Sequence, residues 1–360
     1  MTDVGALDPG DDRPVLITGG AGFIGANLAD RLAAGGHRVL IYDALLRPGV
    51  ERNLDWLRER HGQRIAVSIS DVRDSGAIAE AAAQAKAVFH LAAQVAVTTS
   101  LSDPRADFEI NALGTFNLLD ALRLNTNGVP LVFASTNKVY GDLGDVPLRE
   151  QDGRHMPADE GLRAGGIGED YPLAFHTPYG CSKGAADQYV LDYARSYGIP
   201  AAVLRMSCIY GERQLGTEDQ GWVAHFLIRA LRGETITLFG DGRQVRDILN
   251  VKDAVAAYLG VVSRIDALSG KAYNLGGGPA NAVSLRELLS YIQDLVGEPL
   301  SVRHEDWRQG DQRYFVADTG RLEAACGPLS ATPWRTGVAE LADWLRGQEI
   351  PQDSARRSAA

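Results

Sequence analysis

The feature that most constrains the fold is a glycine-rich stretch at residues 15–25, Val-Leu-Ile-Thr-Gly-Gly-Ala-Gly-Phe-Ile-Gly. Its apolar start predicts a short buried strand, which Gly19 ends in a tight turn. Gly22 lets the main chain come close to a bound group, and Gly25 lets the following helix pack against the strand. Because unpaired backbone N–H groups and the positive end of the peptide dipoles point outward where this helix begins, the stretch predicts a site for a pyrophosphate.

A glycine-rich turn of an α/β protein that binds no dinucleotide is the alternative interpretation of this stretch. The sequence around it favours the dinucleotide site. An Ala/Leu-rich helical pattern follows at residues 26–34, and a second apolar strand at residues 38–42 ends in Asp43. Asp43 lies 18 residues beyond Gly25, close to the roughly 20 at which a carboxylate accepts a hydrogen bond from the ribose of a dinucleotide. A carboxylate favours NAD over NADP because it would repel a 2′-phosphate, although Arg47 leaves NADP open.

Composition and charge exclude several classes of protein. The chain has 360 residues, of which 45% are hydrophobic, and a net charge of −10, which disfavours a nucleic-acid-binding surface. No apolar run reaches the roughly 20 residues of a membrane span, and residues 1–12 are acidic, so we expect a cytoplasmic protein with no membrane partner. The three cysteines are widely spaced and form no Cys-x-x-Cys or His/Cys cluster, so neither a disulfide framework nor a metal site is predicted.

Apolar strands alternate with helical patterns through the first half of the chain. The strands are expected at residues 15–17, 38–42, 65–69, 87–91, 131–134 and 201–206, and the helices at residues 26–34, 53–60, 108–124 and 179–197. Strands that are apolar throughout predict a parallel sheet covered by helices on both faces, a doubly wound α/β (Rossmann) fold. Ligands of such sheets bind outside the carboxyl ends of the strands.

The second half of the chain has a less regular order. Helices are expected at residues 221–232, 251–262, 285–296 and 338–345, and strands at residues 236–238 and 272–275. Residues 142–177 are charged and glycine-rich, and we expect one long functional loop there. We therefore expect an NAD-binding domain at residues 13–210 that includes the catalytic residues, a smaller mixed substrate-binding region at residues 211–346 interleaved with it, and flexible tails at residues 1–12 and 347–360. The substrate would lie in the cleft between the two regions.

Tyr179 and Lys183 are spaced i, i+4 and stand on one face of a predicted helix. A free phenol titrates near 10, but a lysine ammonium and a positively charged nicotinamide ring would bring the pKa of the tyrosine toward 7. Thr136, in the turn after the fifth strand, would supply a hydroxyl to the same substrate oxygen. Taken singly, Tyr179 could be a packed aromatic residue and Thr136 a turn residue; together with the glycine-rich stretch they predict a catalytic site.

The predicted cofactor site extends along the carboxyl ends of the strands. Asp71, after the third strand, either contacts the adenine or caps the next helix. Small residues after the fourth strand would let cofactor and substrate approach the backbone. The residues expected to bind NAD are Gly19, Gly22, Phe23, Ile24, Gly25, Asp43, Asp71, Val72, Leu91, Ala92, Ala93, Gln94, Asn111, Ser135, Tyr179 and Lys183.

Taken together, these motifs resemble the extended short-chain dehydrogenase/reductase family over residues 14–345. The motifs are the glycine-rich stretch, the Thr136 turn, Tyr179-x-x-x-Lys183 and Arg246-Asp247. Within that family the chain is similar to the CDP-paratose 2-epimerases, also called CDP-tyvelose epimerases. The segments that carry this similarity are residues 135–142, 175–189, 219–222 and 311–318.

The resemblance implies an NAD-dependent nucleotide-sugar epimerase that inverts C2 of a CDP-hexose such as CDP-paratose or CDP-tyvelose. Tyr179 as phenolate would take the proton from the C2 hydroxyl while hydride leaves the same carbon, and the 2-keto sugar would then turn over and receive the hydride on its other face. A nucleotide-sugar 4-epimerase is the nearest alternative, because it uses the same Tyr, Lys and Thr. A non-catalytic NAD-binding relative is a further alternative, and such proteins commonly lack the Tyr–Lys pair.

Because the sugar must rotate, the affinity would come from the nucleotide and its two phosphates. Arginine matches phosphate in a bidentate way, so Arg213, Arg246 and Arg313 are candidate anchors, each with a plain alternative as a surface or ion-paired residue. His176 either lines the sugar pocket or shapes the preceding loop. The residues expected to bind substrate are Gln94, Thr136, Asn137, Lys138, His176, Ser207, Arg213, Gln244, Arg246 and Arg313.

The two positions after Thr136 separate the chain from the dehydratases and decarboxylases of the family. Asn137-Lys138 follows Thr136, where sugar 4,6-dehydratases carry Asp-Glu and uronate decarboxylases tend to carry Glu at the second position. Neither water elimination nor decarboxylation is therefore expected. On the substrate side, Asn250 replaces a usual His, and Met206-Ser207-Cys208 replaces an aromatic residue and Asn.

The same resemblance bears on assembly. Relatives usually pair through two helices each, which implies a homodimer or homotetramer built through residues 108–124 and 179–197.

Overall fold

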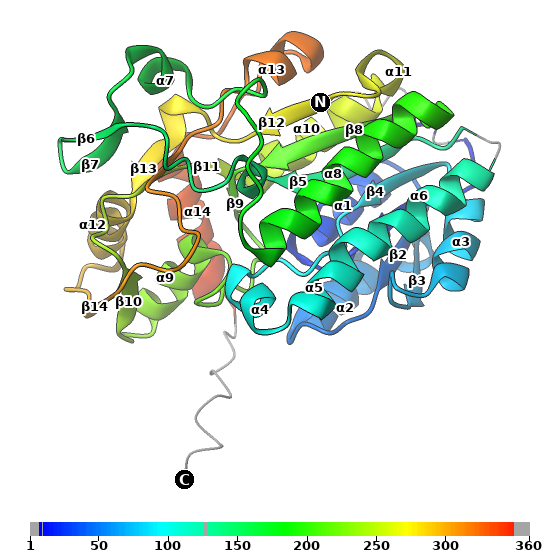
Figure 1. The fold of residues 1–360 in the computed structure, drawn as a ribbon. Coiled ribbons are helices and arrows are strands. Elements are labelled where there is room, and N and C mark those ends of the chain that lie inside the picture. Colours follow the sequence, from blue (N-terminus) through cyan, green and yellow to red (C-terminus); the bar gives the residue numbers. More distant parts are fainter. Residues whose placement is uncertain (1–6, 9, 126–127, 349–360) are drawn as a thin grey trace.

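The computed structural model describes residues 7–8, 10–125 and 128–348. Its centre is a seven-stranded parallel sheet with helices on both faces (Figure 1). Across the sheet the strands are β3 (Ile65–Ile69), β2 (Val39–Asp43), β1 (Val15–Thr18), β4 (Ala87–His90), β5 (Leu131–Thr136), β8 (Ala201–Met206) and β12 (Ala272–Leu275). The expected doubly wound α/β fold is confirmed.

The order of the strands reverses beside β1. From β1 the chain runs through β2 and β3 toward one edge of the sheet, and then returns to β4 and continues through β5, β8 and β12 toward the other edge. At the reversal, Thr18 of β1 lies between Tyr42 of β2 and His90 of β4. Adjacent connections leave such a point in opposite directions, so a crevice opens there at the carboxyl ends of the strands.

Both faces of the sheet are largely buried because most strands carry apolar side chains on both sides. Val15 and Ile17 pack into one core cluster, whereas Leu16 between them packs into the other, as the alternation of side chains along a strand requires. The first face is covered by α1 (Phe23–Ala34), α2 (Val50–His61), α10 (Val251–Val262) and α11 (Ile265–Leu268). The second face is covered by α3 (Ser75–Gln84), α6 (Gly114–Leu124) and α8 (Thr177–Tyr197).

The helix expected at residues 108–124 is longer and less regular than predicted. It follows α4 (Val97–Ser102) and consists of α5 (Pro104–Phe108), a π-helical turn (Glu109–Leu113) and α6. A π-helical turn inserts one extra residue and is frequent at functional sites. Here the turn carries Asn111, one of the predicted cofactor-binding residues.

The C-terminal half forms a second, mixed region beside the carboxyl ends of the main sheet (Figure 1). Its strands are β9 (Cys208–Tyr210), β10 (Ile236–Phe239), β11 (Val245–Asn250), β13 (Ala282–Ser284), β14 (Val302–Glu305) and β15 (Tyr314–Phe315), and its helices are α9 (Trp222–Leu231), α12 (Leu285–Val296) and α14 (Trp334–Arg346). The helix α13 (Gly320–Cys326) packs on the main sheet against β12 and α10. β9 follows β8 closely and pairs with β11, so the two sheets are joined. β12 returns to the main sheet and pairs with β8, so the two halves are interleaved.

Residues 142–177 do not form the single loop that we expected. They contain a hairpin of β6 (Leu148–Gln151) and β7 (Arg154–Pro157), followed by α7 (Glu160–Gly165). The hairpin turn is Asp152-Gly153, and both residues have positive φ. Asp-Gly is a strong local signal for such a turn, and the charged strands around it masked that signal.

The described part of the expected N-terminal tail packs against the domain. Leu7 is buried, and the Lys86 ammonium donates to the carbonyl oxygens of Asp8 and Asp11 at 2.9 and 2.7 Å. The rest of the two expected tails, apart from the described residues 347–348, lies outside the described residues. Among the described residues, no helix combines the length and apolar character that crossing a membrane requires, and no three His, Cys, Asp or Glu side chains gather as a metal site.

Candidate active site

A cavity of about 790 Å³ opens at the carboxyl ends of the strands and extends under the C-terminal region. It is lined by the glycine-rich turn after β1, the turns after β4 and β5, the start of α8, and Arg246 of β11. Its lining includes these predicted site residues: Gly19, Gly22, Phe23, Ile24, Gly25, Asp43, Asp71, Val72, Leu91, Ala92, Ala93, Gln94, Ser135, Thr136, Asn137, Lys138, Tyr179, Ser207, Gln244 and Arg246.

The glycine-rich turn has the geometry of a dinucleotide cradle. Gly19 has φ +69°, and a Cβ there would lie 2.8 Å from the backbone nitrogen of Ala92. A Cβ at Gly25, in the first turn of α1, would overlap the carbonyl oxygen of Gly19. Side chains at these positions would fill the space between the turn and its neighbours, so the close backbone approach needed for a pyrophosphate depends on them.

Asp43 ends β2 at the edge of this cradle. Its carboxylate accepts hydrogen bonds from the backbone nitrogens of Ala21 and Leu45 at 3.0 and 2.9 Å. The bond to Ala21 ties the acid to the glycine-rich turn, at the place predicted for the ribose. Arg47 lines the same cavity.

Asp71 also lines this end of the cavity, and its carboxylate pairs with Arg73 at 2.7 Å. It does not cap the next helix. Asp74 takes that role by accepting from the backbone nitrogens of Gly76 and Ala77. Of the two roles considered for Asp71, the capping role is therefore wrong.

Tyr179 and Lys183 stand one turn apart on α8, as their spacing predicts, and both are buried. Burial raises the pKa of Tyr179 to about 12, and a hydrogen bond with Thr136 opposes that rise. Burial lowers the pKa of Lys183 to about 7, and Asp187 and Asp107 oppose that fall. The Lys183 nitrogen lies 4.1 Å from the centre of the Phe133 ring. The pKa of Tyr179 is therefore shifted away from 7, opposite to the direction that we expected, because burial is its largest influence and Lys183 is not among the groups that shift it.

Asn111 lies behind this pair and is absent from the cavity lining. Its side chain bonds to the backbone of Gln94 in both directions, at 2.9 and 3.0 Å, and donates to Ser182 at 3.0 Å. Asn111 thus connects the cavity wall after β4 to α8. Lys183 is likewise absent from the lining.

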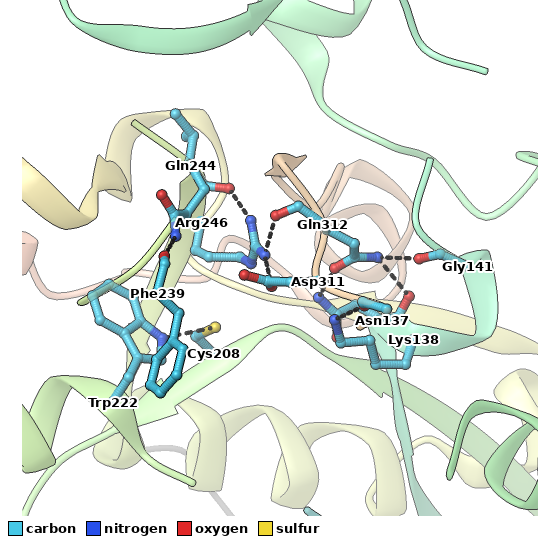
Figure 2. Close-up of polar contacts among 12 residues, drawn as sticks. Asn137, Lys138, Gly141, Cys208, Trp222, Phe239, Gln244, Arg246, Asp311 and Gln312 are labelled. Carbon is cyan, nitrogen blue, oxygen red and sulfur yellow. Dashed lines mark hydrogen bonds and ion pairs between the residues drawn. The ribbon is translucent and has the colours of Figure 1, made fainter. Parts of the chain in front are cut away.

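The turn after β5 is bound to a segment of the C-terminal region, residues 310–312 (Figure 2). The Lys138 ammonium donates to the carbonyl of Gly310 at 2.9 Å, and the Asn137 amide donates to Gln312 at 3.2 Å. Gln312 in turn donates to the carbonyl of Gly141 at 2.6 Å. Burial lowers the pKa of Lys138 to about 8.

Arg246 of β11 and Gln244, the residue just before this strand, line the opposite wall (Figure 2). The Arg246 guanidinium pairs with Asp311 at 2.7 Å and also donates to the carbonyl of Gln312. The Gln244 amide donates to the carbonyl of Phe239 at 2.7 Å. Arg246 therefore reaches the cavity and is already hydrogen-bonded to residues 311–312.

Three predicted substrate residues do not line the cavity. Arg213 lies over the Trp56 ring, 3.9 Å from its centre, and Arg313 lies 5.2 Å from the centre of the Trp307 ring. His176 is half exposed and lies 3.5 Å from Asp142. Contact with a tryptophan ring explains why the two arginine side chains lie where they do. For His176, the alternative that it shapes the preceding loop remains.

The two departures noted in the sequence, Met206-Ser207-Cys208 and Asn250, occupy different surroundings. Met206, Ser207 and Cys208 line the cavity, as expected. Asn250 is buried and absent from the lining; its side chain caps α10 by accepting from the backbone nitrogen of Lys252 at 2.9 Å. Position 250, where Asn replaces the usual His, therefore lies away from the cavity wall.

Sequence reasoning missed Arg308 and His90. Arg308 lines the cavity, lies 3.8 Å from the centre of the Phe239 ring, and pairs with Glu218 and Asp219. His90 at the end of β4 bonds to Thr18 at 2.6 Å, and burial lowers its pKa to about 3. Neither residue stands in a local motif, and only the fold brings each one to its partners.

The fold and the cavity define a Rossmann-type enzyme with a cradle for a dinucleotide and a Tyr–Lys pair beside it. The family model described as the NAD dependent epimerase/dehydratase family matches residues 15–276, and the chain belongs to this family. It is an NAD-dependent enzyme of the extended short-chain dehydrogenase/reductase type.

Individual relatives match almost the whole chain. A CDP-paratose 2-epimerase of Salmonella typhi is 38% identical over 337 residues, which cover 92% of this chain and 98% of that protein. A UDP-glucose 4-epimerase of Mycolicibacterium smegmatis is 31% identical over 333 residues, with coverage of 92% and 98%. The structure of a Thermus thermophilus UDP-glucose 4-epimerase in complex with NAD matches with a TM-score of 0.76 and 31% identity, covering 93% of this chain and 99% of that chain.

Proposed function

We propose that the protein is a nucleotide-sugar epimerase that inverts C2 of a CDP-hexose such as CDP-paratose or CDP-tyvelose. The observation that carries the proposal is the turn after Thr136, where Asn137 and Lys138 line the cavity and are bonded to residues 310–312. An amide and an ammonium offer no carboxyl pair for acid–base elimination. The similarity to the Salmonella typhi CDP-paratose 2-epimerase over nearly the whole chain supports the same choice.

The residues of the cavity divide the work of such a reaction. NAD, when bound in the cradle, supplies the acceptor and donor of hydride. Tyr179 takes the proton from the sugar hydroxyl and returns it to the keto oxygen, and Thr136 holds that oxygen with its hydroxyl. The Lys183 ammonium stabilises the Tyr179 phenolate.

The nucleotide must hold the substrate while the sugar turns over. Arg246 is the proposed diphosphate anchor, because its guanidinium lines the cavity and guanidinium matches phosphate in a bidentate way. Asp311 occupies the guanidinium in the structure, and the diphosphate would compete with that carboxylate. Arg308 is the second cation on this wall, and we include it in the anchor.

A nucleotide-sugar 4-epimerase is the second candidate, and the 31% identity to UDP-glucose 4-epimerases supports it. The same residues serve both reactions, which differ in the carbon that faces the nicotinamide. A non-catalytic NAD-binding protein fits less well, since Tyr179 and Lys183 are both present and buried together.

The experiment that tests the proposal is incubation of the purified protein with CDP-, UDP- and GDP-sugars in deuterated water, with the inverted centre located by NMR. Inversion at C2 of a CDP-sugar without deuterium at that carbon is the expected result. Inversion at C4, or deuterium at the inverted carbon, contradicts direct hydride return at C2. A protein that releases no nicotinamide cofactor on denaturation, and binds none when it is added, contradicts the enzymatic function itself.

We also propose a homodimer, or a tetramer of such dimers, in the cytoplasm. The two helices expected to pair expose aromatic rings on one surface: Phe116 lies 6.1 Å from Tyr189 between ring centres, and Phe108 and Tyr197 are exposed beyond them. Apolar rings of this size on two adjacent helices are typical of a surface covered by a partner.

A further inference from the structure

Asp107 is a buried carboxylate that the proposed reaction does not use. It belongs to α5 and has no exposed surface. Its oxygens lie 2.5 Å from the Ser182 hydroxyl, 3.0 Å from the Gln94 amide nitrogen and 3.1 Å from the Asn111 amide nitrogen. Ser182 lies on α8 between Tyr179 and Lys183, so the carboxylate is bonded to the catalytic helix itself.

The hydrogen bonds of the neighbours fix which atoms face Asp107. The Gln94 nitrogen also donates to the carbonyl of Ala96, and the Gln94 oxygen accepts from the backbone nitrogen of Ala96. The Asn111 oxygen accepts from the backbone of Gln94 while its nitrogen donates to the Gln94 carbonyl. Both amides therefore present nitrogen to Asp107. With the Ser182 hydroxyl they make three donors, the arrangement that suits an ionised carboxylate. Burial raises the pKa of Asp107, and the bonds from Ser182 and Gln94 together with the charge of Lys183 oppose that rise.

All three of these partners are neutral, which distinguishes Asp107 from the other buried acid near Lys183. Asp187 has two bonds to the Arg205 guanidinium, both at 3.0 Å, and accepts from Ser135 at 2.7 Å. The charge of Asp187 is thus compensated by a contacting arginine. A buried charge whose hydrogen-bond partners are neutral costs free energy, and such groups recur where function requires them.

We propose that Asp107 is a positioning residue that holds Lys183 in its ammonium form beside Tyr179. The catalytic consequence of this inference rests on the proposed function. The effect of the Asp107 charge on the titration of Lys183 does not. Both Asp187 and Asp107 act on Lys183. Arg205 pairs with Asp187, whereas the three hydrogen-bond donors to Asp107 are neutral. Its hydrogen bonds to Ser182 and Asn111 fix it against α8.

Asp107 shares this role with Asp187, the acid with the larger effect on Lys183. His90 on β4 stays neutral, because burial lowers its pKa to about 3. Lys138, after β5, interacts with Asp311 and Arg246. Burial lowers the pKa of Lys183 while Asp187 and Asp107 oppose that fall, and Asp107 also raises the pKa of Tyr179.

Asp107→Asn removes the charge and keeps the shape of the side chain. We expect the pKa of Lys183 to fall by about one unit, at the lower end of what one nearby charge does to a buried group. Both limbs of the kcat–pH profile should then move to lower pH, because Asp107 raises the pKa of Tyr179 as well as that of Lys183. The melting temperature should stay the same or rise, since the substitution removes an uncompensated buried charge.

The decisive measurement needs no sugar substrate. The chain has five lysines, so ¹³Cε-lysine NMR of the NAD-loaded enzyme can follow each one, with Lys183→Met to assign the signal. Asp192→Asn is the matched control, because it removes the same charge from an exposed position of the same helix and should leave the Lys183 titration unchanged.

Each outcome decides the matter. A lower pKa of Lys183 in D107N, with the melting temperature kept, supports the proposal. An unchanged titration, or a D107N protein that unfolds or melts earlier, overturns it, because that is the behaviour of a group kept only for its hydrogen bonds. A wild-type enzyme that inverts no nucleotide sugar would instead refute the proposed function and leave the titration result standing.

Discussion

Gly25→Ala tests the dinucleotide cradle most directly, because a single methyl group is added where the structure has no room. The new Cβ would lie 2.7 Å from the Cα of Gly20 and 3.0 Å from the carbonyl carbon of Gly19, and closer still to the Gly19 oxygen. These neighbours are backbone atoms, so the turn and α1 must move apart by several tenths of an ångström. Overpacking of this kind costs about 1–3 kcal/mol.

The displacement falls on the atoms that would hold the pyrophosphate. We expect the affinity for NAD to fall about 10- to 100-fold, which corresponds to about 1.4–2.7 kcal/mol of lost binding free energy. The assay is the amount of nicotinamide cofactor released on denaturation, together with titration of the stripped protein with NAD.

Gly260→Ala is the matched control. Gly260 lies in α10, and a Cβ there would meet its nearest neighbour, the Cys326 side chain, at an ordinary 3.7 Å. Since alanine is the better helix former by about 1 kcal/mol, this variant should bind NAD normally and melt at the same or a higher temperature. Wild-type NAD affinity in G25A would refute the account of the cradle.

Four further predictions concern the rest of the molecule. Tyr179→Phe should lower kcat about 10²- to 10⁴-fold while NAD stays bound; undiminished turnover would contradict its role. Arg246→Gln should raise KM for the nucleotide sugar about 10-fold or more, whereas Arg213→Gln should not, because Arg213 stacks on a tryptophan away from the cavity lining; equal effects would argue against the anchor. Lys138 has a folded pKa lowered to about 8, so the unfolded chain binds more protons between pH 8 and roughly 10.4; thermal melts should show stability rising with pH across that window, and Lys138→Met should flatten the rise. Tyr189→Asp should shift the assembly toward monomer in light scattering, and an unchanged mass would count against the proposed pairing surface.

The sequence predicted the parts of the fold that local patterns encode. The strands of the main sheet are largely apolar, and the helix at Val251–Val262 and the strand at Ala272–Leu275 were predicted to the residue. The hairpin at residues 148–157 was missed because its strands are charged and half-exposed, so only the Asp-Gly turn marked it.

The candidate site divides in the same way. Tyr179, Lys183 and the glycines belong to spacings that can be recognised along the chain, and they lie where those spacings predict. Arg213 was expected to face substrate because a guanidinium suits phosphate, but stacking on Trp56 is a tertiary contact that no local pattern reveals. Arg308 reaches the cavity and covers the ring of Phe239, a residue almost 70 positions away in the sequence.

Asp107 lay four residues before a predicted site residue, Asn111, which is one helical turn. That spacing was available in the sequence, but nothing in the pattern distinguished a buried acid from an exposed one. Its burial depends on α8 packing against α5, which is a property of the folded molecule.

The pairing of β12 with β8 has a consequence for how this enzyme can change over time. A strand contributed by the C-terminal half completes the N-terminal sheet, and α10 from the same half covers one of its faces. Replacing either half with the corresponding half of another protein would therefore leave the remaining half without part of its sheet or its covering helix. We therefore expect the sugar preference to change through substitutions in the turns and short strands around the cavity, while the main sheet and its covering helices are kept.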